Sequence, residues 1–234
     1  MATLNDVFMG QLPQTLPLFP LTGALLLPRG TMPLNIFEPR YLEMLDYARA
    51  HQGVIGMIQP HVSPIEATEG DDNLGTATRG RPLYKTGCVG MITEQAQGPD
   101  NSVLIVLTGL SRFDVVKEVT VDTSFRLAEV DYSRFSGDCM GGHDDKRLDR
   151  SRLMSVLEVF LEQSGLRADW KGLDDAGDEE LLNVVAMVSP LSPAEKQMVI
   201  EAPVLEERFS LLMKIMELTI AGQHYHDQTT PPVH

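Results

Sequence analysis

The apolar residues of this chain follow two different patterns, and the change between them constrains the fold more than any other feature of the sequence. Up to about residue 135, glycine and proline separate short apolar runs, which is typical of β-strands joined by turns. Beyond about residue 145, apolar residues recur every three or four positions, which predicts helices. The sequence therefore predicts an α+β fold, in which a β-rich part precedes a helical bundle.

The β-rich part is expected to form a small, closed or semi-closed sheet that carries one helix. Pro39 fits the first turn of a helix over residues 40–50, in which Tyr41, Leu45 and Ala48 share one face. Gly109 interrupts a continuous strand pattern, so a bulge or a sharp bend is expected there. The expected strands cover residues 16–18, 24–27, 34–37, 54–58, 83–94, 103–107, 112–119 and 125–132.

The helical part carries start and stop signals. An apolar stripe over residues 153–161 is followed by Gly165, and glycine commonly ends a helix. Ser192 and Glu195 have the spacing of a capping box, with proline at the first helical position between them. Two further helices are expected at residues 179–188 and from Pro203 to just before Gly222, the latter with an apolar ridge of Leu205, Phe209, Leu212, Met216 and Ile220.

Composition divides the chain into five segments. Residues 136–145 are rich in glycine and polar side chains, so they are expected to form a linker. A polar stretch from His61 to Pro82 predicts a long surface loop within the β-rich part. The expected segments are an N-terminal extension (1–15), the β-rich domain (16–135), the linker (136–145), the helical bundle (146–222) and a flexible tail (223–234).

Charge and cysteine content exclude several classes of function. The formal net charge of −14 argues against binding to nucleic acid or to anionic membranes, because both need clustered Lys and Arg. Cys88 and Cys139 are too few for a disulfide framework. No apolar run is long enough for a membrane helix, and the first residues lack the pattern of a secretion signal. A cytoplasmic location is therefore expected.

No pattern of catalytic or metal-binding residues stands out. His224, His226 and Asp227 have the spacing of a weak metal clip, but they lie in the expected tail. Cys139 and His143, with the aspartates that follow them, lie in a glycine-rich segment that cannot pre-form a site. Neither a G-x-S-x-G nucleophile motif nor a G-x-x-x-x-G-K-[ST] phosphate loop occurs. We therefore expect no catalytic residue, no cofactor and no metal.

Several short segments follow one another along the chain in a distinctive order. They are Leu-Phe-Pro-Leu at 18–21, Leu-Pro-Arg-Gly at 27–30, Phe37-Glu38-Pro39-Arg40-Tyr41, Tyr-Lys-Thr-Gly-Cys-Val at 84–89, Gly109-Leu110-Ser111-Arg112-Phe113, and the Glu-Lys-Gln and Glu-Arg-Phe pattern within 191–212. In order and spacing, these segments resemble the N-terminal substrate-recognition domain of Lon proteases. No single segment is decisive, but the resemblance extends from Leu16 to about Leu218.

This resemblance implies a PUA-like β pseudo-barrel followed by a helical bundle. It also implies a proteolysis-related role, in which unfolded or extended protein segments are recognised for a separate protease or chaperone. Since the chain contains no ATPase or peptidase motif, we expect a non-catalytic protein-binding module rather than an enzyme. Two alternatives remain: a hydrolase with an unrecognised active site and, against the charge, an RNA-binding PUA-like protein.

The same motifs supply the candidate site residues, each with a functional and a structural interpretation. Glu38 and Arg40 could contact a peptide as a charge pair, or they could stabilise the start of a helix. Arg112 could contact a ligand, or it could form a buried or half-buried ion pair. The complete set of candidate peptide-contact or structural residues is Phe37, Glu38, Arg40, Tyr41, Arg112 and Phe113.

Overall fold

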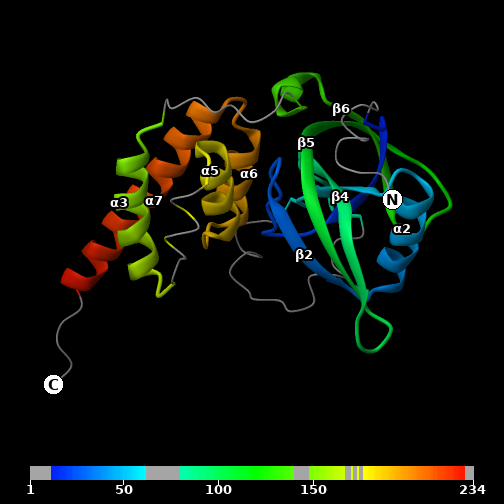
Figure 1. Cartoon of the computed structure of the whole chain (residues 1–234), viewed down its shortest axis with the longest axis horizontal. Helices are drawn as coiled ribbons and strands as arrows, with labels where there is room; N and C mark the ends of the chain where they lie inside the picture. The colour runs from blue at the N-terminus through cyan, green and yellow to red at the C-terminus, as the bar shows by residue number, and fades with distance from the viewer. Residues whose placement is uncertain are drawn as a thin grey trace. The chain divides into compact units, whose positions relative to one another are not determined.

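The computed structural model describes residues 12–61, 80–139, 148–166 and 176–229, together with Trp170 and Leu173. The chain separates into two compact units, Met1–Gly142 and His143–His234 (Figure 1). The first unit contains the sheet and the second contains only helices among its described residues. None of the helices in the described ranges has the length and apolar character needed to cross a membrane.

Five strands of the first unit close into a ring. They are β1 (Thr15–Pro20), β3 (Val54–Ile58), β4 (Thr86–Gln97), β5 (Val103–Val119) and β6 (Arg126–Asp131). β1 pairs with β3 in parallel, and the remaining neighbours β3–β4, β4–β5, β5–β6 and β6–β1 are antiparallel. The predicted α+β fold with a pseudo-barrel is therefore confirmed.

A sixth strand, β2 (Thr31–Ile36), lies outside the ring and pairs only with the first half of β5. The second half of β4 pairs with β5 on its other side, at residues 94–97. β2, residues 94–97 and residues 103–108 together form what we call the three-stranded extension. Its outer edge is β2, which has no strand neighbour on its far side among the described residues.

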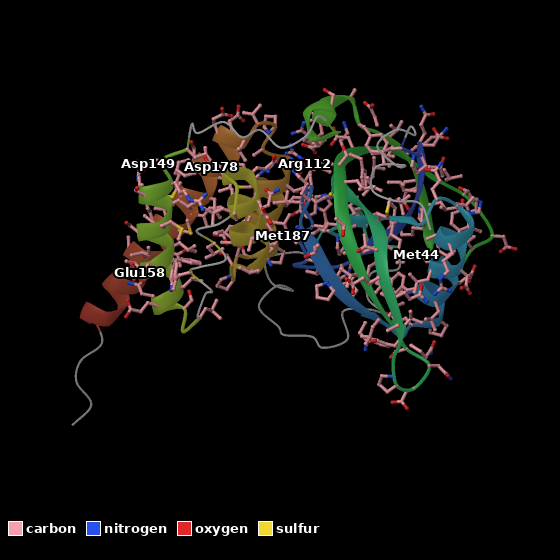
Figure 2. The ribbon with its side chains drawn as sticks, in the orientation of Figure 1. Met44, Arg112, Asp149, Glu158, Asp178 and Met187 are labelled. Carbon is pink, nitrogen blue, oxygen red and sulfur yellow. The ribbon has the colours of Figure 1, made fainter. Side chains whose placement is uncertain are left out.

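The ring encloses an apolar core that the helix α2 (Pro39–Ala50) helps to cover. α2 packs against β1 and β3, and its buried residues Tyr41, Met44, Leu45 and Ala48 include the predicted face. Figure 2 labels Met44 on this helix. Phe113 lies at the centre of the ring core, where it contacts two strands that have glycine at the closest point. A Cβ atom at Gly87 would lie 2.7 Å from the Phe113 ring, so glycine makes room for the aromatic side chain.

Two strand predictions need correction. Residues 24–27 do not form a strand, although Leu25, Leu26 and Leu27 are buried. Gly23 and Arg29 both have positive φ angles, so the backbone turns at each end of this segment and the leucines enter the core from a loop. The predicted strands 103–107 and 112–119 form one continuous strand, β5.

The bulge predicted at Gly109 is confirmed. Opposite β4, the register shifts between Val89–Ser111 and Gly90–Gly109, which leaves one additional residue in β5. A Cβ atom at Gly109 would lie only 2.1 Å from the carbonyl oxygen of Leu27, so no side chain fits at this position. The Gly109 carbonyl also accepts a hydrogen bond from the Arg29 amide at 2.8 Å.

The second unit is built from four helices: α3 (Arg150–Gln163), α5 (Asp178–Val188), α6 (Pro193–Glu201) and α7 (Leu205–Thr229). α7 packs against the other three, and Leu157, Phe160, Leu182, Leu212 and Met216 are among the buried residues. The helical bundle predicted for this part of the chain is therefore confirmed.

The ends of these helices follow the sequence signals. The capping box is confirmed, because the Ser192 hydroxyl accepts from the Glu195 amide and the Glu195 carboxylate accepts from the Ser192 amide. Gly165 has a φ of 67°, as expected of the residue that ends α3. Asp149 caps the start of α3, and Arg150 bonds to Asp178 at 3.1 Å, which ties α3 to α5 (Figure 2).

Other predictions differ from the structure or lie beyond it. α7 continues through Gly222 to Thr229, because its hydrogen bonding is not interrupted at a glycine that keeps helical geometry. A short 3₁₀ helix, η2 (Ser133–Cys139), occupies the first residues of the predicted linker. Residues 62–79, 140–147 and 230–234 lie outside the described residues, so most of the predicted loop, the rest of the linker and the end of the tail are untested.

Candidate functional site

Three of the six candidate residues are buried in the first unit. Tyr41 packs edge-on against Phe19, with ring centroids 4.4 Å apart. Phe113 belongs to the ring core, and Arg112 has only 2% of its surface exposed. These three side chains stabilise the fold and are too buried to contact a bound protein segment.

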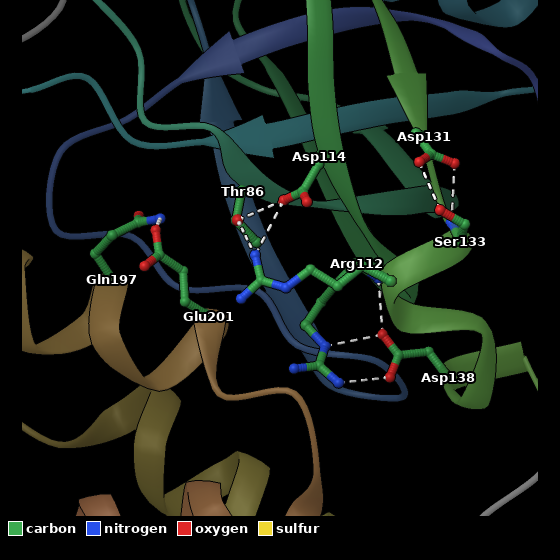
Figure 3. Close-up of polar contacts among 9 residues, drawn as sticks. Thr86, Arg112, Asp114, Asp131, Ser133, Asp138, Gln197 and Glu201 are labelled. Carbon is green, nitrogen blue, oxygen red and sulfur yellow. Dashed lines mark hydrogen bonds and ion pairs between the residues drawn. The ribbon is translucent and has the colours of Figure 1, made fainter.

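Arg112 forms a buried ion pair with Asp138 (Figure 3). Its Nε donates to one carboxylate oxygen at 2.9 Å and its Nη2 to the other at 2.8 Å, while the Arg112 amide also donates at 2.9 Å. The guanidinium lies over the Phe135 ring, 4.3 Å from its centroid. A buried charge is tolerated when it is paired and hydrogen-bonded in this way, so the pair attaches η2 to β5.

A second polar group lies beside this pair. The Thr86 hydroxyl donates to Asp114 at 2.7 Å, and Arg134 lies 3.4 Å from the same carboxylate oxygen (Figure 3). Thr86 begins β4 and Asp114 faces it from β5, so the contact joins two strands of the ring. Both clusters contain structural contacts that hold strands and η2 together.

Glu38 and Arg40 interact at the start of α2. Arg40 Nε donates to Glu38 Oε2 at 2.9 Å, and the Arg40 guanidinium lies 4.5 Å from the Tyr41 ring centroid. The Glu38 side chain makes no capping bond, but its backbone carbonyl accepts from the amides of Tyr41 and Leu42. Both side chains are largely covered, and their charges pair with one another.

Phe37 is the one candidate that is well exposed. It follows β2 directly, and 66% of its surface is accessible. Because an apolar side chain of this size is normally buried, its exposure draws attention to the surface of the three-stranded extension.

The three-stranded extension contains a solvent-open hollow of about 540 Å³. Three consecutive residues of each strand line it: 33–35 of β2, 94–96 of β4 and 104–106 of β5. Leu104 is 45% exposed on this surface, whereas its neighbours Val103 and Ile105 are buried. The lining is mostly apolar, with Pro33, Leu34, Ala96, Leu104, Ile105 and Val106.

Glu94 is the one charged residue in this lining. It is exposed, and no ion pair or hydrogen bond joins its side chain to the described residues. Arg49 approaches the neighbouring Gln95, to which it donates at 3.1 Å, but its charge is paired with Asp46 at 2.6 Å. An apolar surface with a single free carboxylate can hold apolar groups that lie beside a cation.

The part of the chain that the structure describes holds no metal centre. Among the described residues, no three His, Cys, Asp or Glu side chains come together as a metal site would require. Cys88 is buried in the first unit. The hollow of the three-stranded extension is a candidate site for binding in the described part of the first unit.

The hollow was not predicted from the sequence. Residues 103–107 are all apolar, so the run indicates a strand without showing which face is exposed. The available signal was Pro33, because proline in a strand marks the edge of a sheet. This signal does not identify the partner strands that complete the hollow, which lie about 60 to 70 residues further along the chain.

Comparison with known proteins gives a consistent result along most of the chain. Residues 15–217 match the family model described as the ATP-dependent protease La (LON) substrate-binding domain. The Lon protease of Dictyoglomus thermophilum is 25% identical over 115 residues, which are 49% of this chain and 13% of that protease. The Lon protease of Syntrophus aciditrophicus is 23% identical over 95% of this chain, which spans 27% of that protease.

Two solved structures share the fold. A Lon N-terminal domain protein from Xanthomonas campestris has a TM-score of 0.56 and 20% identity, covering 87% of this chain and 97% of that chain. The N-terminal domain of Mycobacterium avium complex Lon protease has a TM-score of 0.58 and 15% identity, covering 87% and 98%. At these identities the likeness establishes the fold alone.

Proposed function

Because this chain belongs to the family of ATP-dependent protease La (LON) substrate-binding domains, we propose that it binds unfolded or extended segments of other proteins and performs no catalysis itself. The match over residues 15–217 is the observation that carries the proposal, since it covers both units rather than one motif. A separate protease or chaperone is the expected recipient of the bound protein.

The surface of the first unit supports this proposal. Phe37 and Leu104 are exposed apolar residues of the kind that bind apolar side chains of another protein. Unfolded chains expose such side chains, whereas native proteins bury them. The exposed apolar side chains of this surface are therefore expected to bind unfolded proteins more tightly than native ones.

The net charge supports a protein partner over a nucleic acid. At −14, the chain repels phosphate groups, so binding to RNA would need a local basic surface that overcomes this repulsion. The described residues that line the hollow include no Lys or Arg. A cytoplasmic location remains a prediction from the sequence.

Fluorescence anisotropy with one labelled protein, in its unfolded and native forms, tests the proposal. We expect the unfolded form to bind with a Kd of about 1 μM, which corresponds to about −8 kcal/mol. The affinity should persist at about 0.5 M salt, because apolar contacts are insensitive to screening and phosphate contacts are not. A labelled RNA serves as the comparison.

Equal binding of the native and unfolded forms, or of neither, would contradict the proposal. Salt-sensitive binding of RNA alone would favour the nucleic-acid alternative. ATP or casein turnover by the pure protein, abolished by a point substitution in it, would favour the enzyme alternative.

A further inference from the structure

We propose that the hollow of the three-stranded extension reads an extended protein segment through its side chains, taking two apolar side chains and an adjacent Lys or Arg that pairs with Glu94. This inference rests on the proposed function and specifies which segments the protein selects. The occupant of the hollow is a segment of another protein. It binds on the face of the sheet and does not add a strand to the sheet edge.

Strand alternation defines the exposed floor of the hollow. In β5 the side chains of Ile105 and Leu107 are buried, so Leu104 and Val106 stand on the opposite, accessible face. The register places one residue of β2 and one of β4 beside each of them. The resulting rows are Pro33–Val106–Glu94 and Asn35–Leu104–Ala96.

The size of this floor limits the occupant. Three residues along a strand span about 10 Å, and two gaps between three strands span a further width of about 10 Å. An extended segment of about three residues fits this length, with the side chains of its first and third residues on the same side. Two apolar side chains, two positions apart, therefore match the apolar floor.

Pro33 argues against strand addition at the edge. Pro33 lies opposite Val106 in the outermost strand of the described sheet. Proline has no amide hydrogen to donate to a neighbouring strand, so strands tolerate it where the nitrogen faces a free edge, and we infer that orientation for Pro33. A partner strand on that edge would meet a missing donor at the centre of a strand of six residues. Proline at this place is a recognised protection against edge pairing.

Charge complementarity specifies the remaining feature of the segment. The Glu94 carboxylate lies at the side of the floor without a cationic partner among the described residues. Arg49 donates to the neighbouring Gln95, but its guanidinium is already paired with Asp46. A Lys or Arg beside the apolar residues would supply the missing charge, whereas Asp or Glu would be repelled.

Three labelled peptides test the inference with the full chain. All have Gly-Ser flanks, and their cores are Lys-Ser-Leu-Ser-Leu-Ser-Lys, the same core with Glu replacing both Lys, and the same core with Ser replacing both Leu. We expect the first to bind most tightly. Leu104→Asp should weaken it about tenfold or more, because a buried leucine contact is replaced by a charge.

Val116→Asp is the matched control, because Val116 lies on the same strand, is 62% exposed and is outside the hollow. It should leave the affinity within about twofold. Glu94→Lys should invert the preference between the Lys and Glu peptides, and Glu94→Gln should abolish it. Circular dichroism and the urea midpoint verify that each variant is folded.

The outcomes separate this inference from the proposed function. If unfolded protein binds but Leu104→Asp and Val116→Asp behave alike, or if Glu94→Lys leaves the charge preference unchanged, the hollow is not the reading surface and the proposed function stands. If neither the peptides nor unfolded protein bind, both proposals fail.

Discussion

The two halves of strand β5 serve different purposes, although they are continuous in sequence and in hydrogen bonding. The second half lies in the closed ring, where Arg112 and Asp114 are buried and bonded to Asp138 and Thr86. The first half lies in the three-stranded extension, where Leu104 is exposed and no further strand of the described ranges pairs with β2. The ring half has polar side chains that are buried, on the strand face opposite Phe113, and the extension half has apolar side chains that are exposed.

This inversion indicates where stability and binding are located. Buried polar groups with complete partners fix the geometry of the ring, and removing one of them leaves a charge in an apolar interior. Exposed apolar groups contribute little to stability, so their retention at the surface is consistent with a binding role. Substitutions in the ring half should therefore affect folding, and those in the extension half should affect binding.

The largest expected effect on stability is that of Asp138→Ala, which breaks the ion pair with Arg112 in the ring half of β5. It removes the acceptor of three Arg112 hydrogen bonds and leaves the guanidinium buried without its counter-charge. We expect a loss of about 3–5 kcal/mol in the free energy of unfolding, measured by urea denaturation.

Glu129→Ala is the control for Asp138→Ala, because Glu129 forms an exposed pair with Lys117 at 3.0 Å. It should cost about 0–1 kcal/mol. Replacing both buried partners, as Arg112→Met with Asp138→Leu, should cost less than Asp138→Ala alone because no charge remains buried. Equal effects of Asp138→Ala and Glu129→Ala would show that the buried pair contributes no more to stability than an exposed one.

Gly109→Ala tests the junction between the halves. Gly109 forms the bulge, and its new Cβ would overlap the Leu27 carbonyl, so the loop that ends at Arg29 must move. We expect a loss of about 1–3 kcal/mol in the same urea experiment. Gly222→Ala, at a helical position with open space around it, should instead stabilise α7 by about 0.5–1 kcal/mol. A neutral Gly109→Ala would mean that the bulge is not tightly constrained.

Pro33→Thr tests the extension half without touching the ring. It adds an amide donor at the free edge of β2, so the edge becomes able to pair with another strand. We expect a change of about 0.5 kcal/mol or less in stability, together with concentration-dependent self-association in sedimentation velocity. A variant that remains monomeric at high concentration would show that proline does not protect this edge.

The smallest expected effect concerns the end of β6. The Ser133 hydroxyl and amide both donate to the Asp131 carboxylate, and these bonds lower the pKa of Asp131 below its ordinary value (Figure 3). Ser133→Ala should raise the pKa of Asp131, measured by NMR titration. The stabilisation from these bonds is present above the unfolded-state pKa and is lost as the pH falls through the lower folded-state value. An unchanged pKa would show that the hydroxyl contributes nothing.

The sequence predicted the local features well and the long-range arrangement incompletely. Helix α2, the capping box at Ser192 and the bulge at Gly109 depend on nearby residues, so their signals are readable from the chain. The apolar residues at 24–27 predict a strand where the structure has a buried loop, because they indicate burial without indicating backbone pairing. The hollow could not be predicted, because it depends on pairing between β2, β4 and β5, which are distant in sequence.

The assignment of the candidate residues shows the same limit. Arg112 and Phe37 are both candidate residues from the sequence. Only the fold shows that Arg112 is buried and paired with Asp138, whereas Phe37 remains exposed. The sequence around Arg112 and the sequence around Phe37 do not reveal which of the two side chains is buried and which is exposed. Their accessibility is decided by which distant segments cover them.

Site-specific photo-crosslinking tests the difference between the two halves of β5 most directly. A photoreactive p-benzoylphenylalanine would replace Leu104 in one protein and Val116 in another, two exposed positions on opposite halves of the same strand. Irradiation with an unfolded labelled protein should give a crosslinked product from position 104 and little or none from position 116. Equal crosslinking from both positions, or crosslinking from position 116 alone, would contradict the assignment of binding to the three-stranded extension.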